Sequence, residues 1–598
     1  MLLSALATAL LSGAAVYAQD GGSWSVIGDS QVVCIHTALL PNSRLLCAER
    51  PHSTLRNFPP NPKTNGRVSV EIDLLAPGGA AATVKEVQEN PFCAGHAQLG
   101  DGHILLIGGE NGTYTDSDSG ETFLTDGKRG VRVYTACPEG QTSCTSSRWD
   151  MKTPISTERW YPTVATLADG SAIIIGGSTG SFDYDKLNAD FLVELENPTY
   201  EYYPQKEGTW PRSLSILEGM FPYDLYPPTF QLPTGKVLIF VSNKTALLDY
   251  RDESIDDSIP DILVEDKQPW IYPYTPTAVL LPLLAENDYA ATVQSCGGSR
   301  KSTNASDNRC IAIDTSQAKP EWKLVEPMPV GRLMPDTVIL PDATILYTNG
   351  ADSGRAGGNA GDPDGEPGYQ RPVLSNHVFD PRKNAASRWT TVADSTVPRL
   401  YHSGAVLIAD GRVVTMGSEM ANFEDWLNDR TDCLPYEQNA CTNPFENRLE
   451  AWEPPYLSLP QERPVIRDTV TTITYGSSFV VNMDTNGLDV DFVSFVRYST
   501  STHSTNTDQR LVELQILGRT ADKLYVRAPR DGAMGPPGNW FIFALNKGKP
   551  SVAKTILLKA GAPTNVDVPQ DASSNVPGSA STTFVSTILM SLAALFVL

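Results

Sequence analysis

The chain has 598 residues, which is too long for one ordinary domain, so we expect two or more. It contains 46 glycines and 45 prolines, and only 19% of its residues are charged. This composition favours many short strands joined by turns over long solvated helices. The formal charge of −23 argues against a nucleic-acid partner, because phosphate binding needs a basic surface.

The N-terminal segment is typical of an exported protein. Residues 1–18 are small and apolar, and Val16 and Ala18 are placed for cleavage before Gln19, although no Lys or Arg lies near Met1. We therefore predict a signal peptide over 1–18 and a secreted, extracellular product. Three glycosylation sequons agree with export, and they begin at Asn111, Asn243 and Asn304.

One pattern recurs along most of the chain: an apolar strand, a turn with Asp-Gly or Pro-x-Gly, and a second apolar strand that often ends in Gly-Gly or Gly-Ser. The clearest copies are residues 95–109, 161–177 and 401–418, and weaker copies start near Val33, Tyr226, Pro276 and Met334. Asp-Gly between apolar runs indicates a hairpin with a type I′ turn, in which both central residues have positive φ.

Seven such hairpins predict a seven-bladed kelch-type β-propeller over 24–457, in which each blade buries its faces against its neighbours. An irregular β-sandwich is the alternative, and the number of similar hairpins disfavours it. The copies are further apart than the roughly 50 residues of a simple kelch unit, so the blades must carry insertions. The Gly- and Asp-rich stretch 351–368 is one of them.

The pattern stops after Ser418, and the stiff run Glu453-Pro-Pro-Tyr-Leu457 marks a boundary. Residues 458–560 contain strand-like runs and have the size of one immunoglobulin-like β-sandwich of the E-set type, so the fold class is all-β throughout. Residues 561–583 are typical of a disordered polar stalk.

The C-terminal end resembles a GPI-attachment signal. Small residues at 573–575 are followed by a polar spacer and by the apolar tail 584–598, which would be removed on attachment. The tail is shorter than the roughly 20 residues that a membrane span needs, so a single-pass anchor is the second interpretation. We expect attachment at the cell surface.

Eight of the nine cysteines are close neighbours in the sequence, which is typical of disulfides formed in an oxidising compartment. The provisional pairs are Cys34/Cys47, Cys137/Cys144, Cys296/Cys310 and Cys433/Cys441. Cys93 is left over, and composition alone favours an inert buried thiol there. No compact metal motif such as HExxH or CxxC is present. His402 and His503, taken singly, are better explained as polar loop residues satisfied by backbone groups.

Four stretches together resemble the glyoxal oxidase branch of the galactose oxidase superfamily, and they occur in that family's order from roughly Trp24 to Lys559. They are Arg159-Trp-Tyr-Pro-Thr-Val164, Arg399-Leu-Tyr-His-Ser403, Glu453-Pro-Pro-Tyr-Leu457 and Thr502-His-Ser-Thr-Asn-Thr-Asp-Gln-Arg510. The segment before the first repeat leaves no room for the carbohydrate-binding domain of galactose oxidase, which favours the glyoxal oxidase side.

The resemblance implies one copper ion and a protein-derived radical. Cys93 and Tyr161 match the pair joined by a thioether, and Tyr161, Tyr401, His402 and His503 match the copper ligands, His503 coming from the second domain. Imidazole nitrogen and phenolate oxygen suit Cu(II). Tyr401 would act as the base, and the Tyr161 radical would take a hydrogen atom.

The implied enzyme oxidises small aldehydes of the glyoxal and methylglyoxal type, as hydrates, and reduces O2 to H2O2. An alcohol or galactose oxidase with the same site is one alternative, and a non-catalytic kelch binding protein at the cell surface is another. The stretch Ser178–Phe182 offers no tryptophan to stack on the thioether, which favours aldehydes. We expect a monomer whose peroxide is used by peroxide-consuming enzymes.

Overall fold

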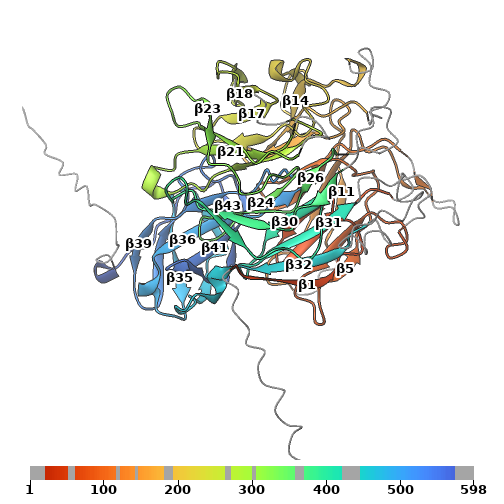
Figure 1. Ribbon diagram of the computed structural model, residues 1–598. Coiled ribbons are helices and arrows are strands. Elements are labelled where there is room, and N and C mark those ends of the chain that lie inside the picture. The colour runs from red at the N-terminus through yellow and green to blue at the C-terminus, as the bar shows by residue number, and fades with distance from the viewer. Residues whose placement is uncertain are drawn as a thin grey trace, which may run out of the picture.

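The computed structural model describes ten segments of the chain, and its strands form a ring of seven sheets with a two-sheet sandwich at one side (Figure 1). The described segments are 21–51, 61–112, 114–115, 122–141, 146–180, 193–262, 271–299, 305–356, 369–419 and 445–572. The predicted signal peptide, residues 573–583 of the predicted stalk, and the apolar tail lie outside them. Within these segments we find no helix with the length and apolar character needed to cross a bilayer.

The seven sheets confirm the predicted propeller, and each of the seven sequence copies supplies the inner strands of one blade. Blade 1 contains β2 (His36–Leu40), β3 (Arg44–Ala48), β4 (Ser69–Asp73) and β5 (Ala81–Val84); blade 2 contains β6 (Gly95–Gln98), β7 (Ile104–Ile107), β10 (Val131–Thr135) and β11 (Arg148–Met151); blade 3 contains β12 (Thr163–Thr166), β13 (Ala172–Ile175), β14 (Thr199–Tyr203) and β15 (Arg212–Ser213). Blade 4 contains β16 (Thr229–Gln231), β17 (Val237–Val241), β18 (Lys244–Asp249) and β19 (Ser254–Asp256); blade 5 contains β20 (Pro276–Leu280), β21 (Thr292–Gly297), β22 (Cys310–Asp314) and β23 (Trp322–Val325); blade 6 contains β24 (Asp336–Ile339), β25 (Ile345–Thr348), β28 (Asn376–Phe379) and β29 (Trp389–Val392).

The last blade closes the ring with a strand from the other end of the chain. Blade 7 contains β30 (Tyr401–Leu407), β31 (Val413–Glu419) and β32 (Arg448–Glu453), and β1 (Ser23–Asp29) pairs with β32 as its outer strand (Figure 1). In the described part of the chain, blades 2 and 6 carry inserted hairpins, as the long repeat predicted. They are the hairpin β8 (Tyr114–Thr115) with β9 (Thr122–Leu124) in blade 2, and β26 (Ala351–Ser353) with β27 (Gln370–Pro372) in blade 6.

The turns between the first two strands of the blades differ from the predicted type I′. Gly102 has φ +87°, whereas Asp101 is not among the residues with positive φ. The Gly102 N–H donates to Leu99 O at 2.9 Å, and the Leu99 N–H donates to His103 O at 2.8 Å. This is a type I turn followed by a left-handed glycine. The Asp101 side chain accepts the N–H of His103 at 3.0 Å, so aspartate stabilises the turn without positive φ. The same pair of backbone bonds recurs around Gly170, Gly235 and Gly411.

Buried arginines connect the start of a blade to the end of its second strand in three blades. Each donates from Nη1 to a backbone carbonyl; the bonds are Arg159 to Gly176 (2.7 Å), Arg332 to Asn349 (3.0 Å) and Arg399 to Gly417 (2.6 Å). Arg159 also forms a buried ion pair with Glu201 at 2.9 Å. Because a buried charge needs full hydrogen bonding, these arginines hold the adjacent inner edge of the blade in one position.

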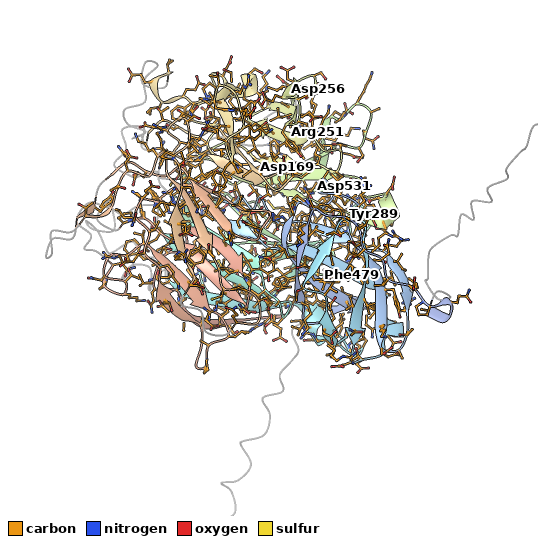
Figure 2. The ribbon with its side chains drawn as sticks, turned by 180° about the vertical axis from the view of Figure 1, so that it is seen from behind. Asp169, Arg251, Asp256, Tyr289, Phe479 and Asp531 are labelled. Carbon is orange, nitrogen blue, oxygen red and sulfur yellow. A yellow bond between two sulfur atoms is a disulfide. The ribbon has the colours of Figure 1, made fainter. Side chains whose placement is uncertain are left out.

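The C-terminal sandwich packs two sheets face to face around the stacked rings of Phe495 and Trp540, whose centroids are 4.6 Å apart. One sheet contains β33 (Ile466–Thr469), β35 (Ser478–Met483), β40 (Lys523–Arg527) and β39 (Ile516–Arg519); the other contains β34 (Thr472–Thr474), β43 (Lys554–Lys559), β41 (Gly538–Asn546), β36 (Phe492–Arg497) and β38 (Leu511–Glu513), with β42 (Lys549–Pro550) on β41. Figure 2 shows Phe479 within this sandwich and Tyr289 on the blade side of the junction. The Tyr289 hydroxyl donates to Glu513 O at 3.2 Å across that junction.

A segment of the sandwich enters the propeller hub, and we call residues 500–510 the finger. Its strand β37 (Thr500–Ser501) pairs with β2, which makes blade 1 a five-stranded sheet. Asp508 accepts hydrogen bonds from Gln98 N at 2.7 Å and from Thr166 Oγ1 at 3.1 Å, in blades 2 and 3. Gln509 accepts the N–H of Ile339 in blade 6 at 3.1 Å. The finger is therefore bonded to several blades at once.

The cysteines follow the prediction as far as the described residues extend. Cys34–Cys47 and Cys296–Cys310 are disulfides, Cys137 is disulfide-bonded, and Cys93 is a free, buried thiol. The predicted partners Cys144, Cys433 and Cys441 lie outside the described residues. Of the sequons, Asn111 is exposed, Asn243 is half-buried and bonded to Asp261, and Asn304 lies outside the described residues.

Replacing Arg159 with methionine should lower the free energy of unfolding by about 3–5 kcal/mol, because Glu201 would keep a buried charge without its partner. Arg148→Met is the matched control, since the Arg148 side chain is 65% exposed in its pair with Asp150, and it should change stability by about 0.5 kcal/mol or less. Denaturant unfolding of both variants checks this. Equal losses in the two would contradict the role given to Arg159.

Candidate metal centre

The five residues singled out in the sequence reach the hub from three blades and the finger. Cys93 precedes β6 of blade 2, and Tyr161 precedes β12 of blade 3. Tyr401 and His402 begin β30 of blade 7, and His503 occupies the tip of the finger. Each is at most 6% exposed. The structure thus brings all five to one buried point.

Four of these residues have left-handed backbone conformations, which non-glycine residues rarely adopt. Their φ angles are +58° at Cys93, +61° at Tyr161, +61° at His402 and +47° at His503. At the finger tip, Ser504 also has positive φ (+63°), and Thr502 and Thr505 exchange backbone hydrogen bonds, which is a type I′ turn. Such conformations persist only where surrounding contacts hold them, and they concentrate at functional sites.

Close backbone contacts account for the position of Tyr161. A Cβ atom on Gly108 would lie 2.4 Å from Arg159 O, and one on Gly177 would lie 2.7 Å from Trp160 O. The glycines that follow the second strands of blades 2 and 3 therefore let the segment 159–161 approach closely. Arg159 is bonded to blade 3 as described above, so Tyr161 follows a fixed stretch of backbone.

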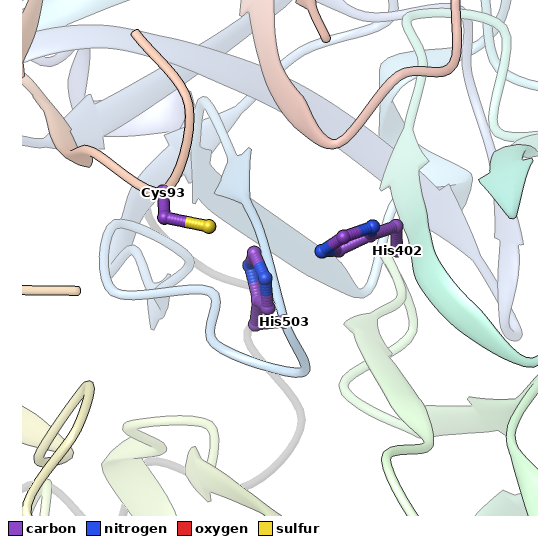
Figure 3. Close-up of side chains that lie close together, drawn as sticks. All are labelled: Cys93, His402 and His503. Carbon is purple, nitrogen blue, oxygen red and sulfur yellow. The ribbon is translucent and has the colours of Figure 1, made fainter. Parts of the chain in front are cut away.

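The polar atoms of the five side chains converge. The Tyr161 and Tyr401 hydroxyl oxygens are 2.7 Å apart, and His503 Nε2 lies 3.2 Å from the Tyr161 oxygen. The Cys93 sulfur and the ligand nitrogens of His402 and His503 all lie within 4.8 Å of one another, and Figure 3 shows these three side chains directed toward a common space. This donor set of nitrogen, oxygen and sulfur can hold a transition-metal ion.

Both imidazoles are oriented by a hydrogen bond at Nδ1, which leaves Nε2 for the centre. His402 Nδ1 lies 2.8 Å from Glu419 Oε2, and His503 Nδ1 lies 2.6 Å from Thr502 Oγ1. His402 Nε2 is buried and has no hydrogen-bond partner among the described residues. A buried nitrogen in that state is costly, and a metal ion at this point would satisfy it. The residues present therefore fit a metal ion.

The charge state of the site also favours a bound cation. Burial lowers the pKa of His402, against the opposing effect of Glu419, and lowers the pKa of His503 well below its usual value. Both imidazoles are then neutral and can act as ligands. Burial raises the pKa of Tyr161 and Tyr401 well above the usual value, so the phenols are protonated without a nearby cation. A cation among them would favour the phenolates.

Several residues of the centre were missed in the sequence. The Tyr272 hydroxyl lies 3.4 Å from the Tyr161 oxygen and 3.5 Å from the Tyr401 oxygen. Glu419 orients His402 and forms an ion pair with Arg50 at 2.6 Å. Trp160 lies edge-on to Tyr161, with ring centroids 4.1 Å apart. Glu419 directly follows the third clear repeat and Trp160 directly precedes the second, so position next to a repeat could have indicated both. No signal in the sequence indicated Tyr272.

Residues 69–456 match the family described as Glyoxal oxidase N-terminus, which is more than half of the chain. The chain belongs to the glyoxal oxidase family. Residues 463–558 match a second family, described as Galactose oxidase-like, Early set domain. The family assignment confirms the resemblance that the four sequence stretches indicated.

Similar proteins include plant and fungal oxidases. Aldehyde oxidase GLOX of Vitis pseudoreticulata is 28% identical over 578 residues, which is 90% of this chain and 97% of the relative. Aldehyde oxidase GLOX1 of Arabidopsis thaliana is 30% identical over 442 residues, which is 69% of this chain and 66% of the relative. A fungal alcohol oxidase solved in complex with copper has TM-score 0.67 and 22% identity, over 90% of this chain and 99% of that one, and supports the fold.

In protein prepared without copper, Cys93 should resist alkylation in the native state and react after unfolding. The side chain is fully buried, so the reagent cannot reach the sulfur. Burial also raises the pKa of the thiol well above its usual value, so the reactive thiolate is scarce. Iodoacetamide labelling followed by peptide mapping checks this. Rapid labelling of Cys93 in the folded protein would contradict the buried position.

Proposed function

We propose that the protein is a copper-radical oxidase that converts small aldehydes, as their hydrates, to carboxylic acids while reducing O2 to H2O2. The observation that carries the proposal is the convergence of Cys93, Tyr161, Tyr401, His402 and His503 at one buried point. His402 Nε2 has no hydrogen-bond partner there in the described part of the chain. Membership of the glyoxal oxidase family supports the same chemistry.

The ligands proposed for one copper ion are His402 Nε2, His503 Nε2 and the hydroxyl oxygens of Tyr161 and Tyr401. Bound copper supplies one-electron redox chemistry and Lewis acidity. Cys93 is proposed to form a thioether with the Tyr161 ring. The two residues are buried side by side, and the Tyr161 N–H donates to Cys93 O at 2.8 Å. Forming the thioether breaks one S–H and one C–H bond, and the two electrons and two protons released reduce O2 to H2O2.

In the proposed oxidation of the substrate, Tyr401 and Tyr161 have different roles. The Tyr401 oxygen, 2.7 Å from that of Tyr161, takes the proton from one hydroxyl of the aldehyde hydrate. The Tyr161 oxygen, as a phenoxyl radical, takes the hydrogen atom from the adjacent carbon. The second electron would be accepted by the bound copper ion, and both electrons then pass to O2. The sum is RCH(OH)2 + O2 → RCOOH + H2O2, which balances atoms and electrons. The buried surroundings exclude bulk water from these transfers.

The choice of aldehyde rests on the relatives named aldehyde oxidase, which align with 90% and 69% of this chain. Alcohol oxidation on the same centre is the second candidate. The edge-on contact of Trp160 with Tyr161 favours it, because the sequence argument for aldehydes assumed no tryptophan at the thioether. Comparing turnover of methylglyoxal with turnover of galactose distinguishes the two candidates.

Export is part of the same proposal, and the disulfides Cys34–Cys47 and Cys296–Cys310 support it because they form in oxidising compartments. The signal peptide at 1–18, GPI attachment, the monomeric state and the use of the peroxide by other enzymes stay predictions.

Copper-loaded protein should consume O2 and release H2O2 faster with methylglyoxal than with galactose. His503→Ala should reduce turnover to background, because the finger would no longer present an imidazole to the centre. His103→Ala is the control. His103 is half-buried at the turn of blade 2, where it pairs with Asp101, so this change should leave turnover unchanged. An oxygen electrode measures O2 consumption, and a coupled peroxide assay measures H2O2 release. Normal turnover in His503→Ala would contradict the proposed copper-radical oxidase. A preference for galactose over methylglyoxal would indicate an alcohol oxidase instead.

Replacing Glu419 with glutamine should weaken copper binding about 10–100-fold, because the carboxylate that fixes the His402 ring would be lost. Glu450→Gln is the matched control: Glu450 is also a buried carboxylate of blade 7, and it bonds to Thr396 instead of a candidate ligand. Anaerobic titration with a competing chelator measures affinity in both variants. Equal effects in the two would remove the orienting role from Glu419.

A further inference from the structure

A chain of hydrogen bonds runs around the hub from blade to blade through the residues of the centre. The Tyr226 N–H of blade 4 donates to Tyr161 O at 3.0 Å, and the Tyr161 N–H donates to Cys93 O at 2.8 Å. The Cys93 N–H then donates to His36 Nε2 of blade 1 at 3.1 Å. The last hydrogen bond of this series is therefore accepted by an imidazole, whereas the two before it are accepted by backbone carbonyls.

His36 is built into the fold at this point. It begins β2, pairs with Ala48 of β3, and is 2% exposed. Because Nε2 accepts a hydrogen bond, the ring is neutral and carries its proton on Nδ1. The ring packs 5.5 Å from that of His96, edge to face, and 6.2 Å from that of His503. It is a buried histidine that the proposed chemistry does not use.

The hydrogen bond to His36 Nε2 is made by Cys93, a residue with a strained backbone conformation. Cys93 has φ +58°, a conformation that costs free energy for a residue with a Cβ atom. The Cys93 N–H is buried, and a buried N–H without an acceptor costs free energy. Losing the acceptor would therefore favour a backbone conformation in which this N–H finds another partner. A change of φ at Cys93 would turn the Cα–Cβ bond and carry the sulfur away from Tyr161. The acceptor on His36 opposes that change.

We propose that His36 is a positioning residue for formation of the Cys93–Tyr161 thioether, and that its Nε2 holds Cys93 in the conformation that directs the sulfur at the Tyr161 ring. The inference rests on the proposed function, since the thioether belongs to it. The bond that forms joins sulfur to ring carbon, with loss of two protons and two electrons to O2 as described above. His36 exchanges no proton in this step.

The test compares variants that remove the acceptor with one that keeps it. His36→Phe and His36→Leu lose the acceptor, whereas His36→Gln retains a side-chain oxygen able to accept the Cys93 N–H. His96→Leu is the matched control, because His96 is an equally buried neighbouring imidazole whose ring makes no hydrogen bond to Cys93. Each protein is made without copper, loaded with Cu(II) under nitrogen, and then exposed to O2.

The readouts are the rate of cross-linking, seen by mass spectrometry as loss of two hydrogens from the joined peptides, and copper affinity measured before oxygen is admitted. We expect cross-linking to slow by about 10²-fold in His36→Phe and His36→Leu, the order of effect for a misplacement of about 1 Å at a reacting group. His36→Gln should recover most of the rate, and His96→Leu should keep it. Copper affinity should stay within a few-fold of wild type in all four.

Cross-linking at the wild-type rate in a folded His36→Phe or His36→Leu would overturn the inference, and so would equal slowing in His96→Leu. If neither acceptor-free variant folds, His36 serves the core and the positioning role is likewise overturned. Absence of the cross-link in wild-type protein loaded with copper and O2 would instead defeat the proposed function, so the two failures are distinguishable.

Discussion

The insertion of the finger into the propeller hub is the constraint on which the centre depends. The innermost strands of a propeller surround an axial space. In this protein the sandwich fills that space with β37, which pairs with β2, and with the polar turn of the finger. Asp508 and Gln509 satisfy backbone N–H groups of blades 2 and 6, which have no other partner at the axis. His503 reaches Tyr161 only because this polar segment is fixed on several sides.

Burial explains why the centre suits a metal ion better than an isolated acid or base. Each imidazole nitrogen away from the centre is held by an oxygen of Glu419 or Thr502, so little rearrangement is needed when a ligand binds. Burial keeps the phenols protonated and the imidazoles neutral until a cation enters. The low polarity that disfavours lone charges therefore strengthens the attraction between the ion and its ligands.

The repeat carried most of the information about the propeller, because the hairpin around Gly102 and its counterparts depend on local sequence alone. The turn type was wrong for the same local reason: Asp101 stabilises a type I turn with its own side chain. Closure of the ring by β1 could not be read locally, since its partner β32 lies at the far end of the propeller. The site residues came from family resemblance, whereas Tyr272 and His36 matter through contacts between blades that no single motif records.

Ring closure by β1 has a consequence for how the protein matures during synthesis. The strand that leaves the ribosome first must wait for β32 before blade 7 is complete, and the finger is translated later still. Cys93 and Tyr161 therefore exist in the nascent chain long before His402 and His503 can join them. The candidate centre is therefore complete only after the finger with His503 has been translated and has entered the hub.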